Sequence, residues 1–178
     1  MGEKTIALIG YMATGKTTIG KKIAQKLQLK FMDTDVLIQN DQGKSINDIF
    51  KSQGEQAFRK MENALLKELL KQENILISTG GGIILNEENR RILKENTFLV
   101  TLTAKPESIY RRVQKNSERP LLNSKNTLEK IVQMMEKRGP FYTIGDLIIQ
   151  TDQLEEEACV KKIISAYQNS FIEIEKKS

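Results

Sequence analysis

Short apolar runs alternate with longer amphipathic stretches along the chain. Several of the short runs are almost entirely apolar, as in strands whose two faces are both covered. Five runs predict β-strands, and they span residues 5–9, 29–32, 75–78, 98–102 and 146–150. The alternation predicts a three-layer α/β/α fold, in which right-handed crossovers join a five-stranded parallel sheet with helices on both faces.

The longer stretches carry apolar residues at helical spacing. One apolar face lies within residues 19–27 and another within residues 65–70. Ser45 and Asp48 fit a capping box that begins a short helix. The last helix is predicted to begin near the three glutamates at 155–157, because acidic side chains stabilise the N-terminal end of a helix dipole.

One segment, residues 114–126, interrupts this pattern. It is polar and charged except for the Pro-Leu-Leu at 120–122. Loops of this length without regular structure are more often functional or disordered than plain connectors. We therefore expect a mobile lid over a site, and an ordinary long surface loop is the alternative.

The composition narrows the possible chemistry. The chain has 178 residues, with 28 Lys and Arg against 23 Asp and Glu, so its formal charge is 28 − 23 = +5. This length suits one domain spanning residues 1–178. A single cysteine, Cys159, and the absence of histidine exclude an intramolecular disulfide and any site that depends on histidine. No apolar stretch is long enough for a membrane span and no secretory signal precedes the first strand, so we expect a cytoplasmic protein with no membrane partner.

The strongest motif runs from Gly10 to Thr17 and fits G-x-x-x-x-G-K-[ST]. A strand-like run precedes it and an amphipathic helix follows it. Gly10 and Gly15 allow backbone angles that turn N–H groups towards phosphate oxygens, and the helix adds its positive dipole end. Lys16 supplies a charge for the β- and γ-phosphates, and the Thr17 hydroxyl can bind Mg²⁺. The motif predicts a site for ATP and Mg²⁺ but does not identify the acceptor.

Two groups of residues supply candidate acceptor chemistry. Asp33 and Asp35 follow the second strand, and in an extended segment their side chains would point the same way. A strand-end turn capped by aspartates is the alternative. Arg59 and Glu62 lie three residues apart on a predicted helix, so a carboxylate can hold the arginine as a fork for a substrate carboxylate. An ordinary surface salt bridge is the alternative.

Further candidates follow the third strand and the lid segment. The three glycines at 80–82 would let backbone N–H groups approach a ligand closely, although a flexible turn is the alternative. Arg119 lies within the lid segment, where it could close on phosphate and stabilise charge during transfer. Arg138 and Tyr142 lie at the end of the helix that follows.

The order and spacing of these motifs resemble the shikimate kinase family, in the nucleoside-monophosphate-kinase-like branch of P-loop kinases. The resemblance covers the chain up to about the start of the last helix. It implies a P-loop NTPase fold with a substrate-binding region at about 34–62 and a lid at about 114–126. It also implies that ATP and Mg²⁺ serve to phosphorylate the 3-hydroxyl of shikimate, a step of aromatic amino acid (chorismate) biosynthesis.

The resemblance implies roles for the matching positions. Asp35 would bind the shikimate hydroxyls, either as the base that takes the proton or as a group that only positions the acceptor hydroxyl. The implied catalytic residues are Lys16, Asp35 and Arg119. Asp33 would reach Mg²⁺ through water beside Thr17. The implied substrate-binding residues are Asp35, Phe50, Phe58, Arg59, Gly80, Gly81, Gly82 and Arg138. The implied nucleotide-binding residues are Gly10, Ala13, Thr14, Gly15, Lys16, Thr17, Thr18, Arg112, Arg119 and Gln153.

The sequence departs from the family pattern at three places, and one of them, Gly145 in place of a more usual alanine, is expected to be neutral. Ala13 stands where many members carry glycine, and we expect the loop to accommodate it. Gln153 stands near the position where some members place an arginine beside the adenine, so the resemblance leaves the purine contact and the nucleotide preference open. Arg112 falls where the family often has an arginine near the adenine.

Two other functions compete with this interpretation. A related kinase could act on another small hydroxy acid such as gluconate, which also offers a carboxylate and hydroxyls. A nucleotide-dependent binding module could use the charge of +5 on nucleic acid, but the chain has no basic run with interleaved aromatic residues. We expect a monomer that binds shikimate and no nucleic acid.

Overall fold

The protein is described here by a computed structural model that covers residues 4–114 and 127–175, with side chains to residue 170. A parallel sheet of five strands has the order β2-β3-β1-β4-β5. The strands are β1 (Thr5–Gly10), β2 (Lys30–Asp33), β3 (Ile75–Ser78), β4 (Thr97–Thr103) and β5 (Leu147–Gln150). Each lies within one residue of its predicted bounds, and the α/β/α prediction is confirmed.

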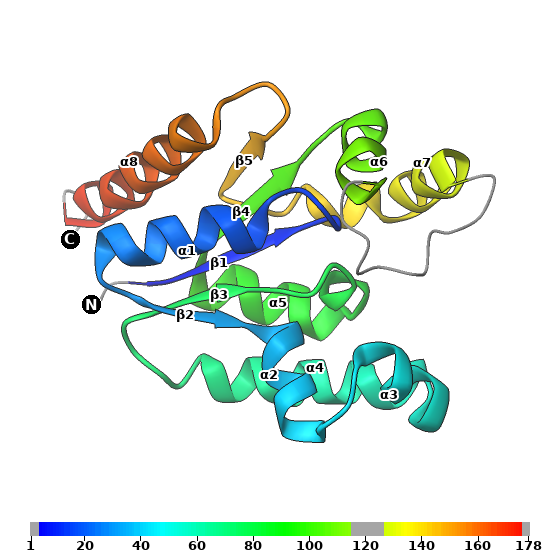
Figure 1. Cartoon of the computed structure of the whole chain (residues 1–178). Coiled ribbons are helices and arrows are strands. Elements are labelled where there is room, and N and C mark those ends of the chain that lie inside the picture. Colours follow the sequence, from blue (N-terminus) through cyan, green and yellow to red (C-terminus); the bar gives the residue numbers. More distant parts are fainter. Residues whose placement is uncertain (1–3, 115–126, 176–178) are drawn as a thin grey trace.

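Helices cover both faces of the sheet (Figure 1). The helices are α1 (Lys16–Leu27), α2 (Thr34–Gln42), α3 (Ile46–Gln53), α4 (Glu55–Leu69), α5 (Glu87–Asn96), α6 (Pro106–Gln114), α7 (Thr127–Arg138) and α8 (Glu156–Glu175). Two short 3-10 helices, η1 (Ile83–Leu85) and η3 (Gly139–Tyr142), follow β3 and α7. Within residues 4–114 and 127–175, no helix combines the length and apolarity that crossing a membrane requires.

Alternate residues of the strands build two separate cores. Ile6 and Leu8 of β1 pack towards α1 and α8, whereas Ala7 and Ile9 pack towards α4, α5, α6 and α7. A third, smaller cluster joins α2, α3 and α4 through Ile38, Ile49 and Phe58. This cluster packs the predicted substrate-binding region, at about 34–62, beside the carboxyl ends of the strands.

Helix caps set where the elements begin. The Ser45 side chain accepts a hydrogen bond from the Asp48 N–H at 3.1 Å, which confirms the predicted cap of α3. The Asp33 side chain accepts from the N–H groups of Asp35 and Val36, so α2 begins directly after β2. The cap on α2 has a consequence for the site, because it turns Asp33 and Asp35 in different directions.

Candidate active site

The loop between β1 and α1 closes around the first turn of α1. A Cβ on Gly10 would lie 2.3 Å from the Leu102 carbonyl oxygen, so a side chain has no room there. The Lys16 Nζ donates to the carbonyl oxygens of Gly10 and Tyr11, at 2.7 and 2.9 Å. The lysine ammonium therefore lies over the loop, beside the N–H groups that begin α1, which is the arrangement a polyphosphate needs.

Ala13 adopts a backbone conformation that favours glycine. Its φ is 58°, in the left-handed region, where an alanine is less stable than a glycine by about 1 kcal/mol. The Arg112 Nη1 donates to the Ala13 carbonyl oxygen at 3.1 Å and helps to hold this conformation. The expected tolerance of alanine is therefore observed, and it carries a conformational cost.

The predicted extended geometry of Asp33 and Asp35 is wrong. Asp35 lies in the first turn of α2, because the Asp33 side chain caps that helix. Asp33 Oδ2 accepts from the Thr17 hydroxyl at 3.1 Å, on the phosphate side of the site. Asp35 instead lines a pocket with the glycine segment, so the two carboxylates face different parts of the site.

Thr17 and Asp33 offer oxygen atoms suited to Mg²⁺. In kinases this ion usually takes one or two protein oxygens and completes its shell with substrate phosphates and water. The hydroxyl and the carboxylate lie 3.1 Å apart beside the phosphate loop, so both can reach one ion or its waters. In the part of the chain that the structure describes, no group of three or more acidic, cysteine or histidine side chains is placed to hold a metal by itself.

Arg59 and Glu62 form a largely buried ion pair on α4. Arg59 Nη1 donates to Glu62 Oε2 at 2.6 Å, and the exposed fraction of the Glu62 side chain is only 1%. Arg59 Nη2 also donates to Glu55 at 2.8 Å. Burial raises the pKa of Glu62 to about 7, although the nearby Arg59 guanidinium acts in the opposite direction. The burial contradicts the surface-salt-bridge alternative and indicates that the pair orients Arg59.

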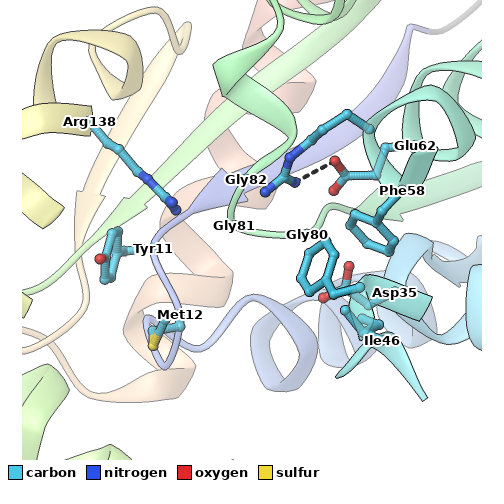
Figure 2. Close-up of a pocket in the computed structure, with 12 residues that line it drawn as sticks. Tyr11, Met12, Asp35, Ile46, Phe58, Glu62, Gly80, Gly81, Gly82 and Arg138 are labelled. Carbon is cyan, nitrogen blue, oxygen red and sulfur yellow. Dashed lines mark hydrogen bonds and ion pairs between the residues drawn. The ribbon is translucent and has the colours of Figure 1, made fainter. Parts of the chain in front are cut away.

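A pocket of about 150 Å³ gathers the predicted acceptor residues. Its lining consists of Tyr11, Met12, Asp35, Ile46, Phe50, Phe58, Arg59, Glu62, Gly80, Gly81, Gly82 and Arg138. All eight residues predicted to bind the substrate are among them. Figure 2 shows that Arg138 reaches the pocket from one side, whereas Asp35, Phe58 and Glu62 lie on the other, with the glycine segment between them.

Two of the three glycines make room for charged side chains. A Cβ on Gly80 would lie 2.4 Å from Asp35 Oδ1 and 2.9 Å from Glu62 Oε1. A Cβ on Gly82 would lie 2.3 Å from Arg59 Nη1. The absence of side chains at these positions lets a carboxylate, a carboxyl and a guanidinium approach the backbone together. A flexible turn would not require this, so the packing favours the functional interpretation of the segment.

A second cavity of about 430 Å³ adjoins the phosphate loop. Five of the predicted nucleotide-binding residues line it, namely Ala13, Thr14, Gly15, Thr18 and Arg112. Gln153 is exposed and is not among the lining residues, so the structure does not bring it to this cavity. Thr151 and Leu154 line it instead. The predicted Arg119, and the predicted lid beyond Gln114, lie outside the described residues.

Arg112 is held firmly at the wall of this cavity. Its guanidinium donates to the Thr151 hydroxyl and to the Thr151 carbonyl oxygen, each at 3.0 Å, in addition to Ala13. Arg112 therefore joins the phosphate loop to the segment after β5. The sequence predicted its place but not this bracing, which depends on contacts between residues 39 and 99 positions apart.

The sequence motifs missed several residues that line the two cavities, among them Tyr11, Met12, Ile46, Thr151 and Leu154. Tyr11 and Met12 occupy variable positions of the phosphate-loop pattern, and both line the acceptor pocket. Ile46 reaches the pocket from α3, and Leu154 reaches the nucleotide-side cavity. The first two positions could have been found from their place beside Gly10, whereas nothing in the local pattern distinguishes Ile46 or Leu154 from core or surface residues.

Comparison with known protein families shows to which family this chain is related. The family model described as "Shikimate kinase" matches residues 12–168. The chain belongs to the shikimate kinase family. A shikimate kinase from Caldicellulosiruptor bescii is 43% identical over 164 residues, which cover 92% of this chain and 95% of that protein. A shikimate kinase from Thermoanaerobacter pseudethanolicus is 40% identical over 92% of this chain and 96% of its own length.

Solved structures agree with this family. A shikimate kinase from Acinetobacter baumannii, in complex with shikimate, superposes with a TM-score of 0.87 and is 32% identical, with 94% of each chain covered. A gluconokinase from Sinorhizobium meliloti superposes with a TM-score of 0.63 but is only 14% identical, with 99% of this chain and 98% of that chain covered. The second likeness shows a shared fold alone, so it lends the gluconate alternative no support beyond the fold.

Proposed function

We propose that this protein transfers the γ-phosphoryl group of ATP to the 3-hydroxyl of shikimate, giving shikimate 3-phosphate and ADP. One observation carries the proposal: a small pocket places two arginines and an aspartate beside a phosphate-binding loop. The relative from Acinetobacter baumannii, whose structure holds shikimate, strengthens the choice of acceptor. The reaction belongs to aromatic amino acid (chorismate) biosynthesis.

The two arginines are suited to a carboxylate. Arg59 approaches from α4, where Glu55 and Glu62 hold its guanidinium, and Arg138 approaches from the end of α7. A guanidinium presents paired N–H groups that match a carboxylate, and fixing the side chain beforehand reduces the entropy lost on binding. We infer that this clamp fixes the acid end of the substrate and thereby orients its hydroxyls.

Asp35 is the group proposed to receive the acceptor hydroxyl. It lines the same pocket, next to the backbone of Gly80. A carboxylate there accepts the hydroxyl hydrogen bond and can take its proton as the oxygen attacks phosphorus. Phosphoryl transfer otherwise depends on placing the acceptor in line with the γ-phosphate and neutralising charge.

The phosphate side of the site is assigned to ATP. Lys16 and the N–H groups of the loop hold the phosphates, and the cavity lined by Thr18 and Arg112 is assigned to the nucleoside. Thr17, directly, and Asp33, through water, would hold Mg²⁺, which supplies neutralisation of phosphate charge when bound. Arg119 is proposed to reach the phosphates as the lid closes and excludes water.

We further propose one kinase domain that acts as a monomer in the cytoplasm, without nucleic-acid partners. The runner-up function, phosphorylation of gluconate, uses the same clamp and the same phosphate site. The two functions differ in the acceptor that the pocket selects.

Coupled ADP release tests the proposal. The protein is supplied with ATP and Mg²⁺ and with shikimate, with gluconate or with no acceptor. We expect release that depends on shikimate and exceeds release with gluconate at equal concentration. Faster ADP release with gluconate than with shikimate would show that gluconate is the preferred acceptor. ATP binding without release for any acceptor would instead indicate a module that binds nucleotide without turnover.

A further inference from the structure

Tyr142 contacts the backbone of the glycine segment from outside the pocket. Its hydroxyl donates to the Gly81 carbonyl oxygen at 2.5 Å, across 61 positions of sequence. Tyr142 is buried, with an exposed fraction of 8%, and it does not line the acceptor pocket. Burial raises the pKa of Tyr142 well above its usual range, so the hydroxyl keeps its proton and remains a donor.

This hydrogen bond connects two parts of the acceptor pocket. Tyr142 ends η3, which follows Arg138 directly, whereas Gly81 lies in the segment after β3. In a planar trans peptide, the orientation of the Gly81 carbonyl also fixes the direction of the Gly82 N–H. The bond therefore sets the orientation of the glycine backbone and the distance between that backbone and the helix end that carries Arg138.

A second contact joins the same two segments. Arg90 of α5 donates from Nη1 to the Ile84 carbonyl oxygen at 2.6 Å. The Arg90 guanidinium also lies over the ring of Phe141, with 4.5 Å between its carbon and the ring centroid. One side chain thus touches η1, which follows the glycines, and η3, which follows Arg138. The Tyr142 hydrogen bond and the Arg90 contacts therefore both maintain the spacing between the segment after β3 and η3.

The phosphate loop packs against the same tyrosine. The rings of Tyr11 and Tyr142 meet edge to face, with centroids 6.3 Å apart and an interplanar angle of 75°. Tyr142 therefore lies where the phosphate loop, the glycine segment and the Arg138 segment converge. A contact in this place affects how the acceptor is held relative to the phosphates.

We propose that Tyr142 is a positioning residue for the acceptor: its hydrogen bond to Gly81 fixes the spacing between the glycine backbone and Arg138. This inference rests on the proposed phosphorylation of shikimate. Arg90 maintains the same spacing through Ile84 and Phe141. Neither side chain is assigned a contact with the substrate or with ATP.

The chain contains a matched control for Tyr142. Tyr167 is also buried, at 5% exposed, and its hydroxyl donates to the Lys4 carbonyl oxygen at 2.9 Å. It too meets an aromatic ring edge to face, that of Phe98, with centroids 5.5 Å apart. Lys4 directly precedes β1, so this bond lies at the end of the sheet opposite the site. Tyr142→Phe and Tyr167→Phe remove the same kind of bond in two places.

The test measures the KM for shikimate, the KM for ATP, kcat and the thermal midpoint of both variants. Loss of one neutral hydrogen bond corresponds to a change of roughly five- to tenfold in a binding constant. We expect Tyr142→Phe to raise the shikimate KM by that factor and to change the ATP KM by less than about twofold. Both variants should lower the thermal midpoint to a similar extent, because each loses one buried hydrogen bond. Tyr167→Phe should leave both KM values unchanged.

An unchanged shikimate KM in a folded Tyr142→Phe variant, or an equal rise in Tyr167→Phe, would overturn the positioning role. If Tyr142→Phe does not fold, Arg90→Leu replaces it, with Arg91→Leu as its control. Arg91 is exposed, at 61%, and pairs only with Glu95 among the described ion pairs. Turnover of shikimate by the unmodified protein tests the proposed function separately, so failure of the two ideas can be distinguished.

Discussion

The buried carboxyl of Glu62 predicts an unusual dependence of stability on pH. Burial raises its pKa in the folded protein to about 7 from an ordinary value of 4.5. Folding therefore favours the protonated form, and this contribution to stability is complete below the ordinary pKa. It is lost as the pH rises through about 7, because the unfolded chain then releases the proton more readily than the folded protein.

The magnitude follows from the two pKa values. Their separation corresponds to about 3.4 kcal/mol in total, at about 1.4 kcal/mol for each pKa unit. The part that falls between about pH 5.5 and about pH 8 is about 2 kcal/mol. Because the chain has no histidine, few other groups titrate in this interval and obscure the effect.

Urea unfolding of the wild type and of Glu62→Gln, across this pH range, measures the effect. The glutamine keeps the size of the side chain and cannot ionise. We expect the difference in unfolding free energy between the two proteins to change by about 2 kcal/mol in favour of the variant as the pH rises. Parallel curves for the two proteins, or a change in favour of the wild type, would show that Arg59 keeps this carboxyl ionised and would refute the reasoning.

Three other substitutions test the site. Lys16→Ala should reduce kcat by about 100- to 1,000-fold or more without unfolding the protein, and normal turnover would contradict the role of this lysine at the phosphates. Arg138→Ala should raise the shikimate KM by about 10- to 100-fold, with Lys137→Ala as the exposed control, and a change in the ATP KM alone would refute the clamp. Gly82→Ala should raise the shikimate KM by about tenfold and also lower the thermal midpoint, because the new Cβ would lie 2.3 Å from Arg59 Nη1 and would displace the guanidinium from Glu62; an unchanged KM would show that the guanidinium needs no such space.

Much of the fold follows from periodicity that the sequence displays directly. The five strands are short and, apart from β2, mostly apolar or β-branched, and their bounds differ from the prediction by at most one residue. The helix α2 was missed for a physical reason. Residues 33–35 were expected to be an extended segment after the second strand, with a turn capped by aspartates as the alternative. The Asp33 side chain is indeed a cap, but it satisfies the first N–H groups of a helix, which begins at once. Local capping thus overrides the extended pattern.

The residues of the acceptor site were predictable from short motifs and from the family resemblance that these motifs carry. Arg59, Arg138 and the glycine segment were expected to meet, and they line one pocket. Their supports were not predictable, because burial and long-range contact decide them. The burial of Glu62 and the bond from Tyr142 to Gly81 depend on packing between elements far apart in sequence.

The destination of the phosphoryl group tests the central claim most directly. The unmodified protein is incubated with ATP, Mg²⁺ and shikimate, and the products are examined by phosphorus NMR. The account predicts one new phosphate ester on the 3-hydroxyl of shikimate, formed in step with ADP. An ester at another hydroxyl would contradict the assigned orientation of the acceptor, and inorganic phosphate in place of an ester would contradict phosphoryl transfer to shikimate.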